Sequence, residues 1–145
     1  MRRTNFNEED ISEAIVCEAS WCQVLQSFGN CGHHPLGKYG PDLLFISKER
    51  ACFIEVECRS GWFSDHYPWN TLDVLPRRVE TAKKYSPIPS IFLQSNRDYS
   101  SAALCLIEDW DHSGGDVEVE DFVFIRRDCL DLEAIFYLVD KAQEN

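Results

Sequence analysis

The 145-residue chain contains no uninterrupted apolar run that approaches the ~20 residues needed to span a bilayer. Acids, rather than an apolar segment, follow its first residues, Met1 to Asn5, which argues against a secretion signal. Repeats, low-complexity tracts and a linker between domains are also missing. These absences predict a single domain, residues 1–145, that is soluble and cytoplasmic and has no membrane partner.

Basic residues are scarce as well. The chain has 14 Lys and Arg against 25 Asp and Glu, which gives a net charge of −11. Tight non-specific binding of nucleic acid normally needs a basic footprint, so this balance counts against such a function without excluding it. A local basic concentration is still present in the middle of the chain, at Arg59, Arg77, Arg78, Lys83 and Lys84.

Cysteine, by contrast, is abundant, with seven residues. This is an odd number, and Cys52, Cys58 and Cys105 lie in apolar segments. In a cytosolic protein such a pattern predicts small buried hydrophobic side chains rather than a disulfide framework.

Two apolar runs, 40–46 and 53–59, flank the polar segment Ser47–Arg50 and predict the two strands of an antiparallel hairpin. If the turn centres on Lys48 and Glu49, residues at equal distances from it oppose one another across the hairpin. The register of the whole hairpin then follows from the position of the turn.

This register places Asp42 across from Glu55, and alternation along the second strand puts Glu57 and Arg59 on the same face. Opposed side chains lie roughly 4.5–5.5 Å apart, and like charges at that separation are destabilising. The three carboxylates therefore need a bound cation, a raised pKa or a basic neighbour. A divalent metal is the simplest of these.

Pro41-Asp42 at the start of one strand, followed by Glu55-Val56-Glu57 on the next, resembles the signature of the PD-(D/E)xK, restriction-endonuclease-like nuclease superfamily. The third motif position is Glu57, where the family usually has Lys; this variant occurs in some restriction enzymes. The resemblance extends over residues 8–95. It implies an α/β fold with a mixed central sheet flanked by helices and an α-β-β-β-α-β core, although the first strand of that core is not evident in the sequence.

The same resemblance implies roles for the motif residues. Asp42 and Glu55 would bind Mg²⁺ or Mn²⁺, and Glu57 would bind a second metal or act as general base. In the resembled family a Glu on the preceding helix often joins the metal site. Glu18 is our candidate for this metal ligand, in preference to Glu13.

Residues 8–28 have the spacing of a helix, on which Glu18 falls within the apolar stripe while Glu13 projects to the opposite side. A carboxylate in that position needs a partner. The alternative is a partly exposed Glu18 at the edge of the stripe. The apolar residues of the stripe are Ile11, Ala14, Ile15, Trp21, Cys22, Leu25 and Phe28.

Residues 29–41 are rich in Gly, Pro and His and predict a loop, with at most a short strand, leading into Asp42. In one interpretation His33, His34 or Lys38 contacts a substrate phosphate, and Lys38 is our substrate-binding candidate. A zinc site is a weaker alternative because the spacing matches no closed structural pattern. Its candidate ligands are Cys17, Cys22, Cys31, His33 and His34.

The connector 60–74 is long and aromatic. Connectors of this length are often functional, and its aromatic residues could stack on bases of a single-stranded or frayed nucleic acid. Trp62 is our candidate for binding the substrate in this way. Two alternatives remain: a loop packed over the sheet by its own aromatics, and a protein-binding surface. The other aromatic residues of this connector are Phe63, Tyr67 and Trp69.

Pro76 can begin the next helix, which ends near Tyr85. In the resembled fold this helix packs near the active site and sometimes supplies the basic residue missing from the motif. Arg59, Arg78 or Lys83 is therefore a candidate to stabilise the transition state. Arg77, Arg78 and Lys83 are also candidates for binding substrate, and a solvated basic face is the alternative.

Further along the chain, 90–95, 102–107 and 117–125 are predicted strands and 131–142 a predicted helix. The leading functional hypothesis is a metal-dependent nuclease acting on nucleic acid, DNA in preference to RNA. The competing hypothesis is a catalytically inactive protein of the same fold that binds a protein partner, as an acidic DNA mimic does. The sequence predicts no oligomeric state.

Overall fold

The computed structural model describes residues 8–33, 41–107, 116–118 and 121–143. Its helices are α1 (Glu8–Leu25), α2 (Pro76–Lys84), the short 3-10 helix η3 (Arg127–Cys129) and α4 (Leu132–Gln143). Its strands are β1 (Asn30–His33), β2 (Leu43–Ser47), β3 (Arg50–Cys58), β4 (Thr71–Asp73), β5 (Ser90–Ser95), β6 (Ser101–Leu106), β7 (Asp116–Glu118) and β8 (Val123–Arg126). The fold is mixed α/β, as the sequence predicts.

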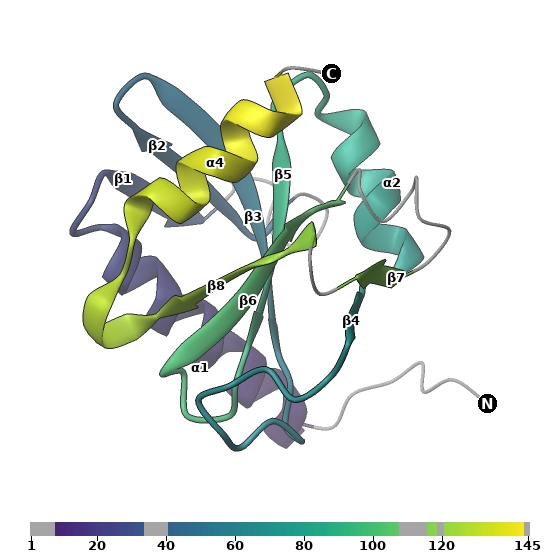
Figure 1. Cartoon of the computed structure of the whole chain (residues 1–145). Helices are drawn as coiled ribbons and strands as arrows, with labels where there is room; N and C mark the ends of the chain where they lie inside the picture. Colours follow the sequence, from purple (N-terminus) through teal and green to yellow (C-terminus); the bar gives the residue numbers. More distant parts are fainter. Residues whose placement is uncertain (1–7, 34–40, 108–115, 119–120, 144–145) are drawn as a thin grey trace.

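Six strands form one sheet in the order β1-β2-β3-β5-β6-β8 (Figure 1). β3 and β5 are parallel, and the other neighbouring strands of this sheet are antiparallel. A parallel pair needs a crossover connection, which here contains α2. From α1 to β5 the elements therefore follow the order α-β-β-β-α-β, with β4 inserted before α2 and paired to β7 in a separate sheet.

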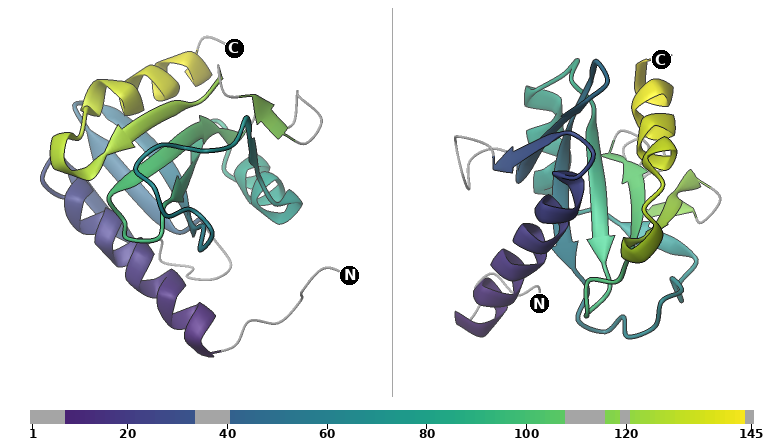
Figure 2. Two further views of the ribbon diagram at one scale, coloured as in Figure 1. Left: turned by 60° about the horizontal axis from the view of Figure 1, so that its bottom comes forward. Right: turned by 90° about the vertical axis from the view of Figure 1, so that its left-hand side faces the viewer.

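The two faces of the six-stranded sheet are covered by different elements. Figure 1 draws α1 and α4 to the left of β5 and α2 to its right, and Figure 2 shows the same arrangement from two other sides. One core joins α1 and α4 to the sheet and includes Trp21, Leu25, Ile54, Leu93 and Leu138. The other core joins α2 and the 60–74 connector to the sheet and includes Trp62, Leu72, Val79, Phe92 and Cys105.

The β2–β3 hairpin has the predicted register. Ser47 pairs with Arg50 and Leu43 with Ile54, so the turn centres on Lys48 and Glu49. Both turn residues have positive φ, 49° and 66°, which is the conformation of the turn type that best matches the twist of a hairpin. This register brings the start of β2 beside the middle of β3.

Two strand predictions need correction. The short strand allowed within 29–41 is β1, which pairs with β2 and supplies the strand that was not evident in the sequence. The predicted strand 117–125 is wrong, because its two ends belong to different sheets. β7 pairs with β4 at one end, and β8 pairs with β6 at the other.

The buried stripe of α1 is narrower than predicted and rotated. Ile15 is 62% exposed and Phe28 40% exposed, so neither contributes to the core. The buried residues of α1 are Cys17, Trp21, Cys22 and Leu25, and Glu13 lies one turn before Cys17. Glu13 does not project away, because the thiol of Cys58 on β3 donates a hydrogen bond to its carboxylate at 3.5 Å.

All seven cysteines are free thiols. Five of them are buried, which agrees with their predicted role as small hydrophobic side chains, while Cys58 is half-buried and Cys129 is exposed. Within the described ranges, no helix is long and apolar enough to cross a membrane.

Candidate functional site

Three oxygen atoms, one from the residue before β2 and two from β3, converge on the guanidinium of Arg78. Its Nη1 donates to Oδ2 of Asp42 at 3.2 Å and also to Oε2 of Glu55. Its Nη2 donates to the carbonyl oxygen of Val56 at 3.4 Å. The guanidinium is thus held by two carboxylates and one backbone carbonyl, and we call these four residues the Arg78 cluster.

Each member of the cluster is positioned by its place in the fold. Asp42 lies directly before β2, and its Oδ2 also accepts a hydrogen bond from the backbone N–H of Val56 at 2.8 Å, which fixes the carboxylate against β3. Glu55 projects from β3 on the face that α2 covers. Arg78 projects from the first turn of α2, which begins at Pro76.

The buried charge of the cluster shifts the acidity of Glu55. This residue is only 5% exposed. Burial raises the pKa of its carboxyl from an ordinary 4.5 to about 7; the charge of Arg78 opposes this shift, and the charge of Asp42 adds to it. Strongly perturbed carboxyl groups of this kind concentrate at functional sites, although structural ion pairs produce them too.

The prediction that the opposed carboxylates need compensation is confirmed, and two of the predicted forms occur together: a basic neighbour, Arg78, and a raised pKa at Glu55. Over the described part of the chain, no group of three His, Cys, Asp or Glu side chains is arranged to hold a metal ion. The oxygens around Arg78 form a different donor set, with two side chains and one main-chain carbonyl.

That donor set fits a hard divalent cation in its chemistry. Mg²⁺ and Mn²⁺ prefer oxygen ligands and are commonly held by one or two carboxylates together with waters and substrate oxygens. The three oxygens already surround a cation, the guanidinium. The buried Nε of Arg78 has no hydrogen-bond partner among the described residues.

Glu18 lies beside the cluster but does not contact Arg78. Its Oε1 lies 2.7 Å from Nδ1 of His33 on β1. Burial raises the pKa of Glu18, the charge of Asp42 raises it further, and His33 and Arg78 oppose the shift. Glu18 is therefore within electrostatic range of Asp42, and its role as a metal ligand stays a prediction.

Glu57 lies next to the cluster on the same face of β3 and is held by Gln94 of β5, the residue opposite it in the parallel pairing. Nε2 of Gln94 donates to Oε2 of Glu57 at 2.8 Å. On its other side, Oε1 of Gln94 accepts from Nη1 of Arg59 at 3.4 Å. The same Nη1 lies 3.4 Å from the hydroxyl oxygen of Tyr67, and the guanidinium of Arg59 stacks 3.6 Å from the ring centre of Trp69.

Trp62 is not available to a substrate, so its prediction as a base-stacking residue is wrong. It is 0% exposed, and its Nε1 donates to the carbonyl of His66. The physical reason is that the connector closes over the sheet through its own aromatic rings. Tyr67 lies edge-on to both Trp62 and Trp69, with ring centres 5.1 and 5.3 Å apart.

The remaining candidates lie at the surface or outside the described residues. Arg77 is exposed, and its charge lowers the pKa of Glu55 less than that of Arg78 does. Lys83 is exposed on α2, 3.9 Å from the carboxylate of Glu80. Lys38 and His34 fall outside the described residues.

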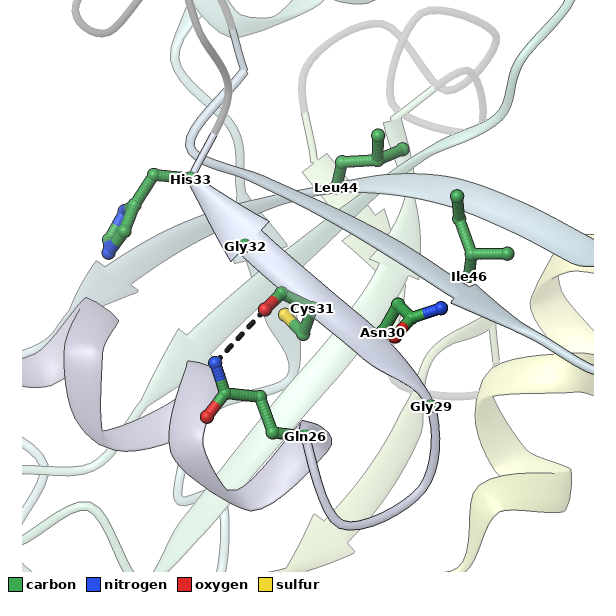
Figure 3. Close-up of a pocket in the computed structure, with 8 residues that line it drawn as sticks. All are labelled: Gln26, Gly29, Asn30, Cys31, Gly32, His33, Leu44 and Ile46. Carbon is green, nitrogen blue, oxygen red and sulfur yellow. Dashed lines mark hydrogen bonds between the residues drawn. The ribbon is translucent and has the colours of Figure 1, made fainter.

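An open pocket of about 460 Å³ lies apart from the cluster, at the β1 edge of the sheet (Figure 3). Figure 3 shows Gln26 reaching from the end of α1 to the carbonyl of Cys31, at 3.1 Å. The pocket shares no lining residue with the Arg78 cluster. Its lining consists of Gln26, Gly29, Asn30, Cys31, Gly32, His33, Leu44 and Ile46.

Sequence reasoning missed Gln94 and the contact of Tyr67 with Arg59. A signal for Gln94 is present, because it is a polar residue inside an otherwise apolar strand, and it is only 2% exposed. A buried amide needs hydrogen-bond partners, and here these are Glu57, Arg59 and the hydroxyl of Tyr67. Tyr67 gives no comparable signal among the other aromatics of its connector.

The chain matches no protein-family model and no curated protein.

Proposed function

We propose that this protein is a metal-dependent phosphodiesterase acting on nucleic acid, with a restriction-endonuclease-like fold. The single observation that supports this most strongly is the convergence of Asp42, Glu55 and the carbonyl of Val56 on one cationic group. These residues come from the Pro-Asp and Glu-x-Glu segments of the motif. The α-β-β-β-α-β order of elements supports the proposed fold.

In this proposal Asp42, Glu55 and the Val56 carbonyl would hold Mg²⁺ or Mn²⁺. When bound, the ion supplies Lewis-acid chemistry, polarising the scissile phosphate and lowering the pKa of a water molecule. Because Arg78 uses the same three oxygens, release of these oxygens by Arg78 is part of the proposal. The burial cost of the two carboxylates is then met by one cation or the other.

Glu57 would accept the proton of the attacking water. The carboxylate is suited to this because Gln94 already fixes one of its oxygens at 2.8 Å while the residue stays half-buried. A positioned general base of this kind contributes roughly 100-fold to 10,000-fold in rate. The usual Lys of the motif is replaced here by this acid, so the compensating positive charge has to come from α2 or from Arg59.

Cleavage of mixed single- and double-stranded DNA and RNA in the presence of Mn²⁺ tests the proposal. We expect cleavage by the wild-type protein that stops when a chelator is added. Glu55→Gln should reduce it by at least roughly 100-fold, while Glu80→Gln, the same change at an exposed position of α2, should have no effect. Equal activity of the wild type and Glu55→Gln would contradict the proposal.

A second candidate function is an acidic, catalytically inactive protein of this fold that binds a basic protein. The specific observation that favours it is that Arg78 pairs with both Asp42 and Glu55 and so offsets part of their charge. The net charge of −11 supports it as well. This candidate predicts that the wild-type protein neither binds Mn²⁺ nor cleaves any nucleic acid.

A further inference from the structure

Arg78 on α2 and Arg59 directly after β3 are in opposite electrostatic situations. Arg78 is held by two carboxylates. Arg59 has no carboxylate within ion-pair distance among the described residues, and its Nη1 is held only by neutral acceptors, the amide oxygen of Gln94 and the hydroxyl of Tyr67. In a protein with a net charge of −11, a cation without an acidic partner needs an explanation.

Arg59 is also held rigidly. Its guanidinium stacks on the ring of Trp69, with its central carbon 3.6 Å from the ring centre. Tyr67 also helps to hold Arg59. Its hydroxyl donates to the carbonyl of Thr71 at 2.7 Å, which leaves the hydroxyl oxygen free to accept from Arg59. Burial raises the pKa of Tyr67 from an ordinary 10 to about 12, so the hydroxyl stays protonated well above neutral pH.

The remaining donors of Arg59 are open to a ligand. Nε and Nη2 of Arg59 have no hydrogen-bond partner within the described residues, and neither nitrogen is fully buried. These two N–H groups form the edge of the guanidinium that binds phosphate or carboxylate oxygens in a bidentate manner. A guanidinium stacked on an aromatic ring loses little further freedom when such an anion binds.

We propose that Arg59, supported by Trp69, Tyr67 and Gln94, is a binding site for one phosphate group of a single-stranded nucleic acid. This inference rests on the proposed function for the identity of the anion. The Cα of Arg59 lies four residues beyond that of Glu55 along the direction of β3, roughly 13 Å at about 3.3 Å per residue. In this proposal Arg59 binds the phosphate next to the scissile one, so that the substrate extends over more than one nucleotide and Arg59 supplies positive charge beside the reacting group.

Single-stranded nucleic acid is the class that the charges favour. Duplex DNA is bound through many phosphates and needs a broad basic surface, which a chain with 14 basic and 25 acidic residues does not offer at this site. One phosphate contact predicts a weak salt dependence. The logarithm of the affinity for a single strand should fall against the logarithm of salt concentration with a slope of about −0.7.

The test is binding of a 5′-phosphorylated thymidine trinucleotide in the presence of EDTA, where no cleavage occurs. The indole N–H of Trp69 is followed by NMR, and circular dichroism checks that each variant is folded. We expect Arg59→Gln to weaken binding roughly 10-fold or more. Arg59→Lys keeps the charge and the stem but loses the planar fork, so it should weaken binding by a smaller factor.

Arg97→Gln is the matched control, because Arg97 also lies over an aromatic ring, at 5.2 Å from the centre of Phe63. It should bind the trinucleotide as the wild type does. Wild-type affinity in both Arg59 variants, or no saturable binding by the wild type, would overturn the inference. If the wild type cleaves nucleic acid and the Arg59 variants bind normally, only the Arg59 site is contradicted. If the trinucleotide binds at Arg59 but nothing is cleaved, only the proposed nuclease activity is contradicted.

Discussion

The guanidinium of Arg78 lies against the carboxylate of Asp42, with Nη1 3.2 Å from Oδ2, although Arg78 stands in the first turn of α2. A cation at that position opposes the helix dipole, which favours acids at the N-terminus. The helix has no acid in its first turn and no side-chain N-cap. Asp42 and Glu55 supply the missing negative charge from the sheet, so the position of α2 and the charge of the cluster depend on each other.

Replacing Arg78 should destabilise the protein. Arg78→Met leaves Asp42 and Glu55 without a counter-ion, and removal of one partner from a buried ion pair costs about 3–5 kcal/mol of unfolding free energy. Mn²⁺ should recover part of this loss, because it would bind the freed oxygens in the folded state only.

Urea unfolding at pH 8, with and without Mn²⁺, measures both effects. Arg77→Met is the control, since Arg77 is exposed on the same turn, and it should change stability by about 0.5 kcal/mol or less. An Arg78→Met variant as stable as the wild type would show that the cluster is not a buried, charged site.

Glu55 should make the stability of the folded state depend on pH. Its pKa is about 7 in the folded protein against an ordinary 4.5, so between these values the folded state holds a proton that the unfolded chain has released. The stability contributed by this group is complete below pH 4.5 and is lost as the pH rises through about 7. At about 1.4 kcal/mol per pH unit, the loss is at most about 3 kcal/mol.

Glu55→Gln removes this titration. The variant should therefore gain stability relative to the wild type as the pH is raised from 5 to 8, by up to about 3 kcal/mol. Chemical unfolding at the two pH values gives the difference, and Glu80→Gln serves as the control carboxyl-to-amide change. A difference between the wild type and Glu55→Gln that is the same at both pH values would contradict the shifted pKa.

Replacing Glu57 should lower the rate of cleavage without changing the affinity for the metal. Glu57→Gln keeps the size of the side chain and an oxygen that can accept from Gln94, but it removes the base. We expect cleavage to fall by roughly 100-fold to 10,000-fold, with the affinity for the first Mn²⁺ unchanged. Full activity in Glu57→Gln would show that the water is activated elsewhere.

Trp62 should affect stability rather than substrate binding. Trp62→Phe leaves a cavity in the core and removes one of the two donors to the carbonyl of His66, which keeps the hydroxyl of Ser64. The change should cost roughly 1–3 kcal/mol. Its affinity for the thymidine trinucleotide, measured on folded protein, should equal that of the wild type. A folded variant with weakened binding would return Trp62 to the list of substrate-contacting residues.

The sequence predicts the parts of this fold that depend on local rules. The Lys48-Glu49 turn, the alternation along β3 and the apolar run of β5 are each determined within a few residues, and their predictions are confirmed. The segment 117–125 was mispredicted because its two halves pair with strands that lie elsewhere in the chain. Continuous alternation does not reveal such a change of partner.

The candidate site shows the same division. Asp42 and Glu55 follow from the hairpin register, and the need for a cation follows from their shared face. The hairpin register does not predict which basic residue pairs with these carboxylates. That it is Arg78 depends on how α2 packs on the sheet. The partnership of Glu57 with Gln94 likewise depends on the register between β3 and β5, which the crossover sets.

Calorimetric titration with Mn²⁺ tests the central claim most directly, using the wild type and Asp42→Asn. The amide of the variant keeps the shape of the side chain and an acceptor for Val56 N–H but loses the charge. We expect a saturable binding isotherm for the wild type. In Asp42→Asn the binding should be lost or its affinity lowered at least about 10-fold. If neither the wild type nor Arg78→Met gives a heat of Mn²⁺ binding, a metal site at Asp42 and Glu55 is contradicted.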